Sequence, residues 1–140
     1  MPVARAAYRA MSMISLVLLA VALSVFTYYN RVLKNDAWNQ ADQLYPAIAA
    51  WVNQQDPTAT VMINNPPAYR YHGGGLSVVI PNEKLAVTLQ AARQYGVEYL
   101  ILDANHPAPL ADLYNQPEDH PGLTLVKTFG NVYVFEIVEP

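Results

Sequence analysis

One stretch constrains this chain more than any other: the run from Ala10 to Asn30, which contains no charged residue. A helix rises about 1.5 Å per residue, so about 20 apolar residues are enough to cross the hydrocarbon core of a bilayer. Tyr28 and Tyr29 lie where an interfacial aromatic belt is expected, with Tyr8 at the other end. The run therefore predicts a transmembrane helix over residues 10–30.

Two other interpretations of this run stay open. Small residues at positions 20, 22 and 24, with Arg5 and Arg9 ahead of the run, are also typical of a cleaved signal peptide. The run is longer than the usual apolar core of such peptides, roughly 7–15 residues, which favours a permanent span. A buried core helix is the third interpretation, although core helices seldom lack charge on every side.

Basic residues flank the run on both sides and so do not decide its orientation. Arg5 and Arg9 precede it, and Arg31 and Lys34 follow it, which is a tie under the positive-inside rule. The short arm, residues 1–9, is the easier side to leave in the cytoplasm. We therefore expect a single-pass protein of the inner (cytoplasmic) membrane whose soluble domain is extracytoplasmic.

The remainder of the 140-residue chain is long enough for one compact domain. Of the 8 basic and 11 acidic residues, only Arg5 and Arg9 precede the run, so the remainder carries a net charge of about −5. This charge argues against nucleic acid or an anionic lipid surface as a partner of the domain. Cysteine is absent, which excludes disulfides and thiol chemistry.

Apolar periodicity and turn residues predict the elements of the domain. Residues 31–58 are expected to form a juxtamembrane helix and linker, with a helix over 36–55 that either kinks at Pro46 or restarts there. Residues 59–140 are expected to form the α/β domain. A second helix should start at an Asn82 cap and stop at Gly96, and Gly130-Asn131 should turn a closing hairpin. Strands are predicted over 60–64, 76–80, 97–103, 123–129 and 132–138.

Strands that alternate with helices favour an α/β fold. We expect an N-terminal transmembrane helix followed by a small Rossmann-like three-layer domain. Its sheet should be mostly parallel, and the C-terminal β-hairpin should add an antiparallel edge strand.

Two groups of polar and aromatic residues are weak candidates for ligand binding. The first follows the first predicted strand, and the second follows the central strand, where open α/β sheets place ligands. Asp119 and His120 could approach the second group, but no metal-ligand spacing is present, so we predict no metal, no cofactor and no catalytic residue. Ordinary loop and capping roles explain the same residues better than a ligand site does. The candidates are Asn64, Asn65, Tyr69, Tyr71 and His72 in the first group, and Asp103, Asn105 and His106 in the second.

Two glycine motifs are incomplete. His72-Gly73-Gly74-Gly75 is similar to the oxyanion loop of esterases, but no G-x-S-x-G elbow accompanies it, and Ser77 lies in a predicted strand. The three glycines precede a strand and do not form a dinucleotide-binding fingerprint. A turn that needs positive φ is the simpler explanation.

Several short motifs occur together in a recognisable order: Val61-Met-Ile-Asn-Asn-Pro-Pro-Ala-Tyr, Tyr71-His-Gly-Gly, Val79-Ile-Pro-Asn, Tyr95-Gly-Val-Glu-Tyr-Leu-Ile-Leu and Gly130-Asn-Val-Tyr-Val-Phe-Glu-Ile. With the apolar run, they resemble the last membrane helix and C-terminal soluble domain of bacterial GT-C glycosyltransferases. The group in question is the protein-mannosyltransferase and aminoarabinose-transferase group, or glycosyltransferase family 39. The resemblance covers most of the chain, from Ala10 to the end.

The resemblance implies a role in sugar transfer from a polyprenyl-phosphate donor at the extracytoplasmic face. The family's catalytic carboxylate lies in an early loop between membrane helices, and no position of this chain corresponds to it. The expected function is therefore a non-catalytic accessory domain that shapes the acceptor side or stabilises the membrane part, and that is inactive alone. Expected partners are the lipid bilayer and a multispanning glycosyltransferase part, and the polyprenyl-phosphate sugar only indirectly. The chain would be a fragment, a split gene product or a free-standing relative. The alternative is an independent membrane-anchored module that binds a small ligand or a protein.

Overall fold

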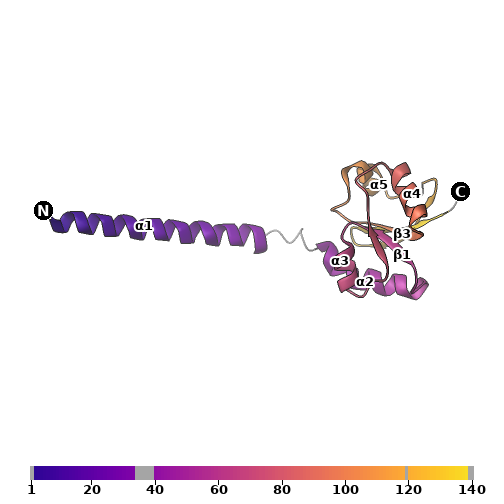
Figure 1. Ribbon diagram of the computed structural model, residues 1–140, viewed down its shortest axis with the longest axis horizontal. Coiled ribbons are helices and arrows are strands. Elements are labelled where there is room, and N and C mark those ends of the chain that lie inside the picture. Colours follow the sequence, from indigo (N-terminus) through magenta and orange to yellow (C-terminus); the bar gives the residue numbers. More distant parts are fainter. Residues whose placement is uncertain (1, 34–39, 119, 139–140) are drawn as a thin grey trace. The chain divides into compact units, whose positions relative to one another are not determined.

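The computed structural model describes residues 2–33, 40–118 and 120–138. The chain divides into two compact units, residues 1–38 and 39–140. In the first unit, helix α1 (Pro2–Tyr28) continues into a π-helical turn over Tyr29–Leu33 (Figure 1). Its segment Met11–Arg31 is long and apolar enough to cross a membrane. The helix thus begins earlier than the predicted span, while the apolar segment agrees with it.

Helix α2 (Gln40–Gln55) opens the second unit and runs through Pro46 without a break. Of the two alternatives predicted at Pro46, a kink or a restart, the restart is therefore wrong. Proline removes one backbone donor, and Tyr45, Ile48 and Val52 offset that loss by burying the same helix face against the sheet. Trp38 and the rest of the predicted first turn lie outside the described residues.

Each of the first two strands is followed by a helix. Strand β1 (Thr60–Ile63) leads into helix α3 (Pro66–Tyr71), and the Asn65 side chain caps that helix by accepting a hydrogen bond from the Ala68 N–H at 3.3 Å. Strand β2 (Ser77–Val79) leads to helix α4 (Leu85–Gln94). The predicted Asn82 cap is wrong: Lys84 holds the cap position and makes no side-chain hydrogen bond there. A hydrogen bond from the Thr88 N–H to the Lys84 carbonyl marks this later start.

The second half of the unit follows the prediction closely. Strand β3 (Val97–Leu102) starts after Gly96, which has a φ of 61° and ends α4 as expected. A 3-10 turn η3 (Ala108–Leu110) and helix α5 (Ala111–Asn115) follow. Strands β4 (Leu123–Phe129) and β5 (Val132–Ile137) are joined by the predicted two-residue turn, where Gly130 has a φ of 56°.

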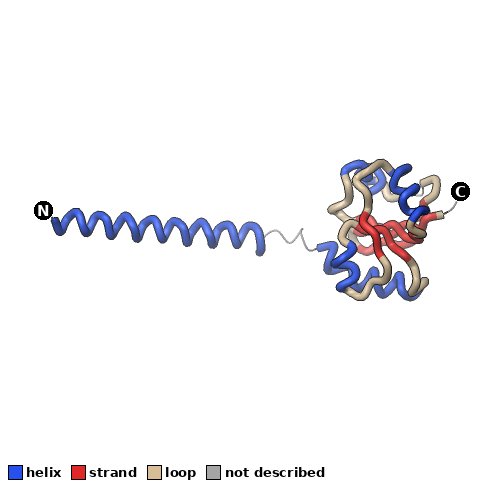
Figure 2. The backbone as a smooth tube through the Cα atoms, in the orientation of Figure 1, coloured by secondary structure: helices blue, strands red, loops and turns tan. Residues whose placement is uncertain are grey.

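The five strands form one sheet in the order β2-β1-β3-β5-β4. Figure 2 shows the strands in red, between the blue helices. Strand β1 pairs in parallel with β2 and β3, whereas β5 pairs antiparallel with β3 and β4. Two parallel and two antiparallel pairs do not give the predicted parallel majority. The hairpin accounts for the difference, because β5 pairs antiparallel with β3 and β4 pairs antiparallel with β5. Strand β4 is the antiparallel edge strand that the hairpin prediction required.

Alternate residues of the central strands belong to two separate hydrophobic cores, one on each face of the sheet. Val61, Ile63, Tyr99 and Ile101 pack with α2 and α3, while Met62, Leu100 and Leu102 pack with α4 and α5. Figure 1 shows these helix pairs on opposite sides of the strands. Because both faces are covered, β3 is an almost continuous apolar strand, as its sequence predicts.

The outer edge of β4 is irregular. Its register against β5 shifts between Leu125 and Lys127, and the Lys127 ammonium lies 5.9 Å from the centre of the Phe129 ring. This strand therefore ends the sheet with a bulge and an exposed positive charge.

Candidate functional site

The two predicted groups of site residues follow neighbouring strands. The last register pair between β1 and β3 is Ile63 with Ile101, so the loops after Ile63 and Leu102 leave the same edge of the sheet. We call this edge, where β1, β2 and β3 end, the carboxyl edge. The chain passes from β1 to β2 on one side and returns to β3 on the other, which makes β1 and β3 the topological switch point.

Asp103 is the polar centre of this edge. Its side chain is only 1% exposed. One carboxyl oxygen, Oδ2, accepts a hydrogen bond from the Tyr45 hydroxyl at 2.9 Å, and Oδ1 accepts one from the Asn105 backbone N–H at 2.7 Å. A buried carboxyl group needs such donors, because an unsatisfied one is costly to bury. Tyr45 thereby ties α2 to the end of the central strand.

The backbone of Asp103 orients the His106 ring. Its Nδ1 lies 2.8 Å from the Asp103 carbonyl oxygen, which can only accept, so Nδ1 carries the proton and donates. In the neutral ring Nε2 is then the acceptor. The Asp103–His106 turn therefore presents one acceptor nitrogen of defined direction.

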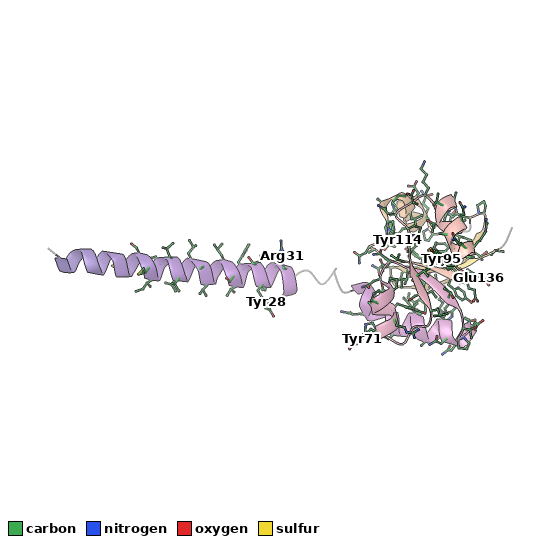
Figure 3. The ribbon with its side chains drawn as sticks, viewed as in Figure 1. Tyr28, Arg31, Tyr71, Tyr95, Tyr114 and Glu136 are labelled. Carbon is green, nitrogen blue, oxygen red and sulfur yellow. The ribbon has the colours of Figure 1, made fainter. Side chains whose placement is uncertain are left out.

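The His106 ring stacks on Tyr114, with centroids 4.2 Å apart and planes 24° apart. Tyr114 also packs edge-on against Tyr133 at 5.3 Å, and its hydroxyl donates to the Asn131 carbonyl at 2.9 Å. Burial, then Tyr133, then Asp103 raise the pKa of the Tyr114 hydroxyl. Figure 3 shows Tyr114 in the upper part of the second unit. Together these rings make a half-buried aromatic surface beside Asp103.

The first predicted group divides into structural and exposed members. Asn65 is the α3 cap, and Asn64 is half-buried. Tyr71 is 85% exposed and is labelled at the lower side of the unit in Figure 3. The His72 ring lies edge-on between Tyr71, at 5.1 Å, and Tyr45, at 6.5 Å.

Tyr69 is fully buried, and its hydroxyl has no hydrogen-bond partner among the residues that the structure describes. Burial raises the pKa of this hydroxyl to about 12. The ring packs edge-on against Tyr45 at 6.3 Å. A Cβ atom on Gly74 would overlap the Tyr69 ring, whereas Gly73 has a φ of 89°. The glycine run therefore serves both a turn and a close approach.

The structure brings the two groups together through a residue that sequence reasoning missed. Tyr45 contacts Asp103 from one group and the Tyr69 and His72 rings from the other. Its helical spacing predicted a buried face, but nothing local signals the partner of its hydroxyl. Tyr114 and Tyr133 were missed for the same reason.

The expected approach of His120 to the second group of site residues is not found in the structure. The His120 backbone bonds to Leu123 at the start of β4, and Leu123 pairs with Ile137 at the edge opposite to Asp103, so His120 does not approach Asp103. Asp119 lies outside the described residues. Across residues 2–33, 40–118 and 120–138, no three His, Cys, Asp or Glu side chains gather as metal ligands. Ser77 lies in β2, as predicted.

The arrangement is chemically suited to binding a polar ligand. It combines the buried Asp103 carboxyl group, which the Tyr45 hydroxyl holds, with the oriented His106 imidazole and the aromatic rings beside it. No family model, curated protein or solved structure matches the chain.

Proposed function

We propose that this chain is a membrane-anchored accessory domain of a glycosyltransferase that uses polyprenyl-phosphate sugars. Helix α1 is its single membrane span, in the inner membrane of a bacterium, and the second unit is extracytoplasmic. The domain shapes the acceptor side or stabilises the multispanning part and does not carry the reaction itself.

One observation supports this proposal above others: the motifs that carry the family resemblance fall on the junctions of the fold. The Asn65-Pro66 step caps and opens α3, and Gly96 ends α4 immediately before β3. Gly130 turns the closing hairpin. Short motifs that coincide with caps and turns in the expected order are what a shared domain fold requires.

The same proposal extends to the fold class. We propose a small Rossmann-like, three-layer domain, because β2-β1-β3 is a parallel doubly wound order and the two cores are covered by different helices. The closing hairpin is the departure from a simple doubly wound sheet.

Reconstitution of the full chain in vesicles with a polyprenyl-phosphate sugar tests the enzymatic part of the proposal. We expect no sugar transfer by the chain alone and transfer when a multispanning partner is supplied. The tagged chain should also co-purify with that partner from native membranes in mild detergent. Turnover by the chain alone would contradict the accessory role.

A second function, an independent ligand-binding module, is favoured by the Tyr45 bridge between the two residue groups. A thermal-shift panel of free hexoses and polyprenyl-phosphate sugars tests it on the full chain in detergent. Stabilisation that is lost in His72→Ala and Asn105→Ala, but kept in Gln55→Ala at the far end of α2, would support this module. Stabilisation that is unchanged in both site variants would exclude this site.

A further inference from the structure

Strand β2 has one partner strand and therefore one free edge. Of the strands in the described part of the chain, β1 alone pairs with it, in a parallel register. The Leu76 carbonyl accepts a hydrogen bond from β1 at 3.0 Å, and the Ile80 N–H donates one to β1 at 3.2 Å. Residues along a strand direct their backbone groups alternately to its two sides, so Ser77 and Val79 direct theirs away from β1.

This free edge is accessible and uncharged. Leu76 is 62% exposed, and Val79 is 60% exposed. Residues 73–82 contain no charged side chain. The part of the chain that follows the apolar run carries a net charge of about −5, which opposes the approach of a second copy. Along the β2 edge this repulsion is locally weak.

The other edge of the sheet, strand β4, differs in both respects. Its register shifts between Leu125 and Lys127, and the Lys127 side chain adds a charge. Edge strands that are bent and carry lysine resist pairing with another chain, whereas regular and uncharged edge strands favour it. Strand β2 is thus the edge that is suited to accept a further strand.

We propose that β2 pairs with the β2 strand of a second copy of this chain, in antiparallel orientation about a two-fold axis at Val78. In that register Ser77 of each copy lies opposite Val79 of the other. Residues in such a pair exchange both of their backbone hydrogen bonds, so every outward backbone group of β2 finds a partner. An identical strand therefore satisfies this edge, as a two-fold symmetric interface requires.

Pro81 favours this register over its neighbours. It lies beyond Val79 on the outward side of the chain and has no N–H to donate. Sliding the copies so that Pro81 faces Ser77 would leave one bond of that pair unmade. Sliding them the other way would place Gly75, which lies outside β2, opposite Val79. The register centred on Val78 keeps all of its pairs within the two strands.

This inference goes beyond the proposed function, and it rests on neither the membrane span nor the role in sugar transfer. It adds a second copy of the chain as a partner. A strand of 3 residues gives a small contact, so the dimer should be weak and should be sought at high protein concentration.

The absence of cysteine makes a direct test simple, because each introduced cysteine is unique. The full chain is prepared in detergent micelles as Val78→Cys, Val79→Cys or Thr128→Cys and is oxidised with copper phenanthroline. In the proposed dimer the Cβ atoms of the two Val78 residues lie about 5 Å apart, close to disulfide distance, whereas the two Val79 residues are diagonal neighbours about 7 Å apart. Thr128, which is exposed on β4, is the control at the other edge.

We expect several-fold more disulfide-linked dimer from Val78→Cys than from Val79→Cys or Thr128→Cys. Random collision would give the opposite order, because Val79 and Thr128 are exposed and Val78 is half-buried. Cross-linking of either control variant that equals or exceeds that of Val78→Cys would overturn the inference. The absence of dimer in all three variants would also overturn it.

A mixture of Ser77→Cys and Val79→Cys chains tests the same register without altering Val78. The mixture should cross-link several-fold more than either variant alone, and equal cross-linking would contradict the register. Adding Val79→Lys to Val78→Cys should abolish the cross-link, because it places an ammonium group at the edge. Adding Val138→Lys, at a residue that is 44% exposed beyond β5, should not. Equal cross-linking in the two double variants would assign the dimer to another part of the chain and overturn the inference.

Discussion

The face of the sheet that α2 and α3 cover buries three tyrosines, Tyr45, Tyr69 and Tyr99, whereas the buried residues on the α4 and α5 face include none. The second face is packed with leucines, Met62 and Phe135. Aliphatic and phenyl groups contribute through volume alone, while each buried hydroxyl adds a polar group that must be satisfied. The two faces should therefore respond to different kinds of substitution, and urea unfolding of the full chain in detergent micelles can separate them.

The largest effect is expected on the aliphatic face. Phe135→Ala removes a fully buried ring and should lower the free energy of unfolding by about 3–5 kcal/mol, because the surrounding side chains cannot fill the cavity. Val79→Ala, at a residue that is 60% exposed on β2, is the control and should change stability by less than about 0.5 kcal/mol. A similar loss in both variants would mean that this face is loosely packed.

On the tyrosine face, Gly74→Ala should cost about 1–3 kcal/mol, since the new methyl group would overlap the buried Tyr69 ring. Gly75→Ala is the matched control, because its nearest atom would be a carbonyl oxygen at 3.6 Å, an ordinary contact. The double variant with Tyr69→Ala should show a coupling energy between the two sites. Additive losses would contradict the close approach.

Tyr45→Phe should lower the free energy of unfolding by about 1–3 kcal/mol, because the Asp103 carboxyl group loses a donor while remaining buried. The ring contacts are retained, so the loss measures the hydroxyl. No loss would show that the bond to Asp103 does not stabilise the fold.

Tyr69→Phe should have the smallest effect on the free energy of unfolding at neutral pH, and any change should be a gain where the other variants show a loss. Its hydroxyl has no partner among the described residues, so removing it should leave stability unchanged or raise it by about 1 kcal/mol. A loss comparable to that of Tyr45→Phe would break the contrast between the two tyrosines.

Alkaline titration sharpens the same contrast. Burial raises the pKa of the Tyr69 hydroxyl in the folded chain from its ordinary value of 10.0 to about 12, so the unfolded chain releases this proton first. The stability associated with the protonated hydroxyl is complete below pH 10 and is lost as the pH rises toward 12. The difference in unfolding free energy between the native chain and Tyr69→Phe should therefore shift in favour of the variant over that range. A difference independent of pH would contradict the raised pKa.

Local signals were sufficient for most elements but not for strand partners. The apolar run over β3, the stop at Gly96 and the turn at Gly130 are each encoded within a few residues, and the structure has them where expected. The parallel majority was not confirmed because pairing of β5 beside β3 depends on contacts between distant residues. The Asn82 cap failed because a suitable residue type does not determine which of three neighbouring positions starts the helix.

The candidate site shows the same limit. Sequence placed Asp103 and His106 at the end of the central strand correctly, because that position follows from the strand itself. The hydrogen bond from Tyr45 to Asp103 joins residues 58 positions apart, and no local pattern encodes it. The hydrogen-bond partners of tyrosine hydroxyls that are distant in the sequence are therefore the part of the site that the sequence alone does not predict.

The irregular β4 edge affects how copies of this chain associate when they are close together. Under the membrane anchoring proposed above, copies of the chain would meet in two dimensions, where an unprotected terminal strand would recruit a strand from its neighbour. The register shift near Lys127 and the charge of that residue oppose such recruitment, since an incoming strand would meet a bent ladder and an ammonium group. The edge strand of the closing hairpin thus also disfavours polymerisation through pairing of edge strands between copies.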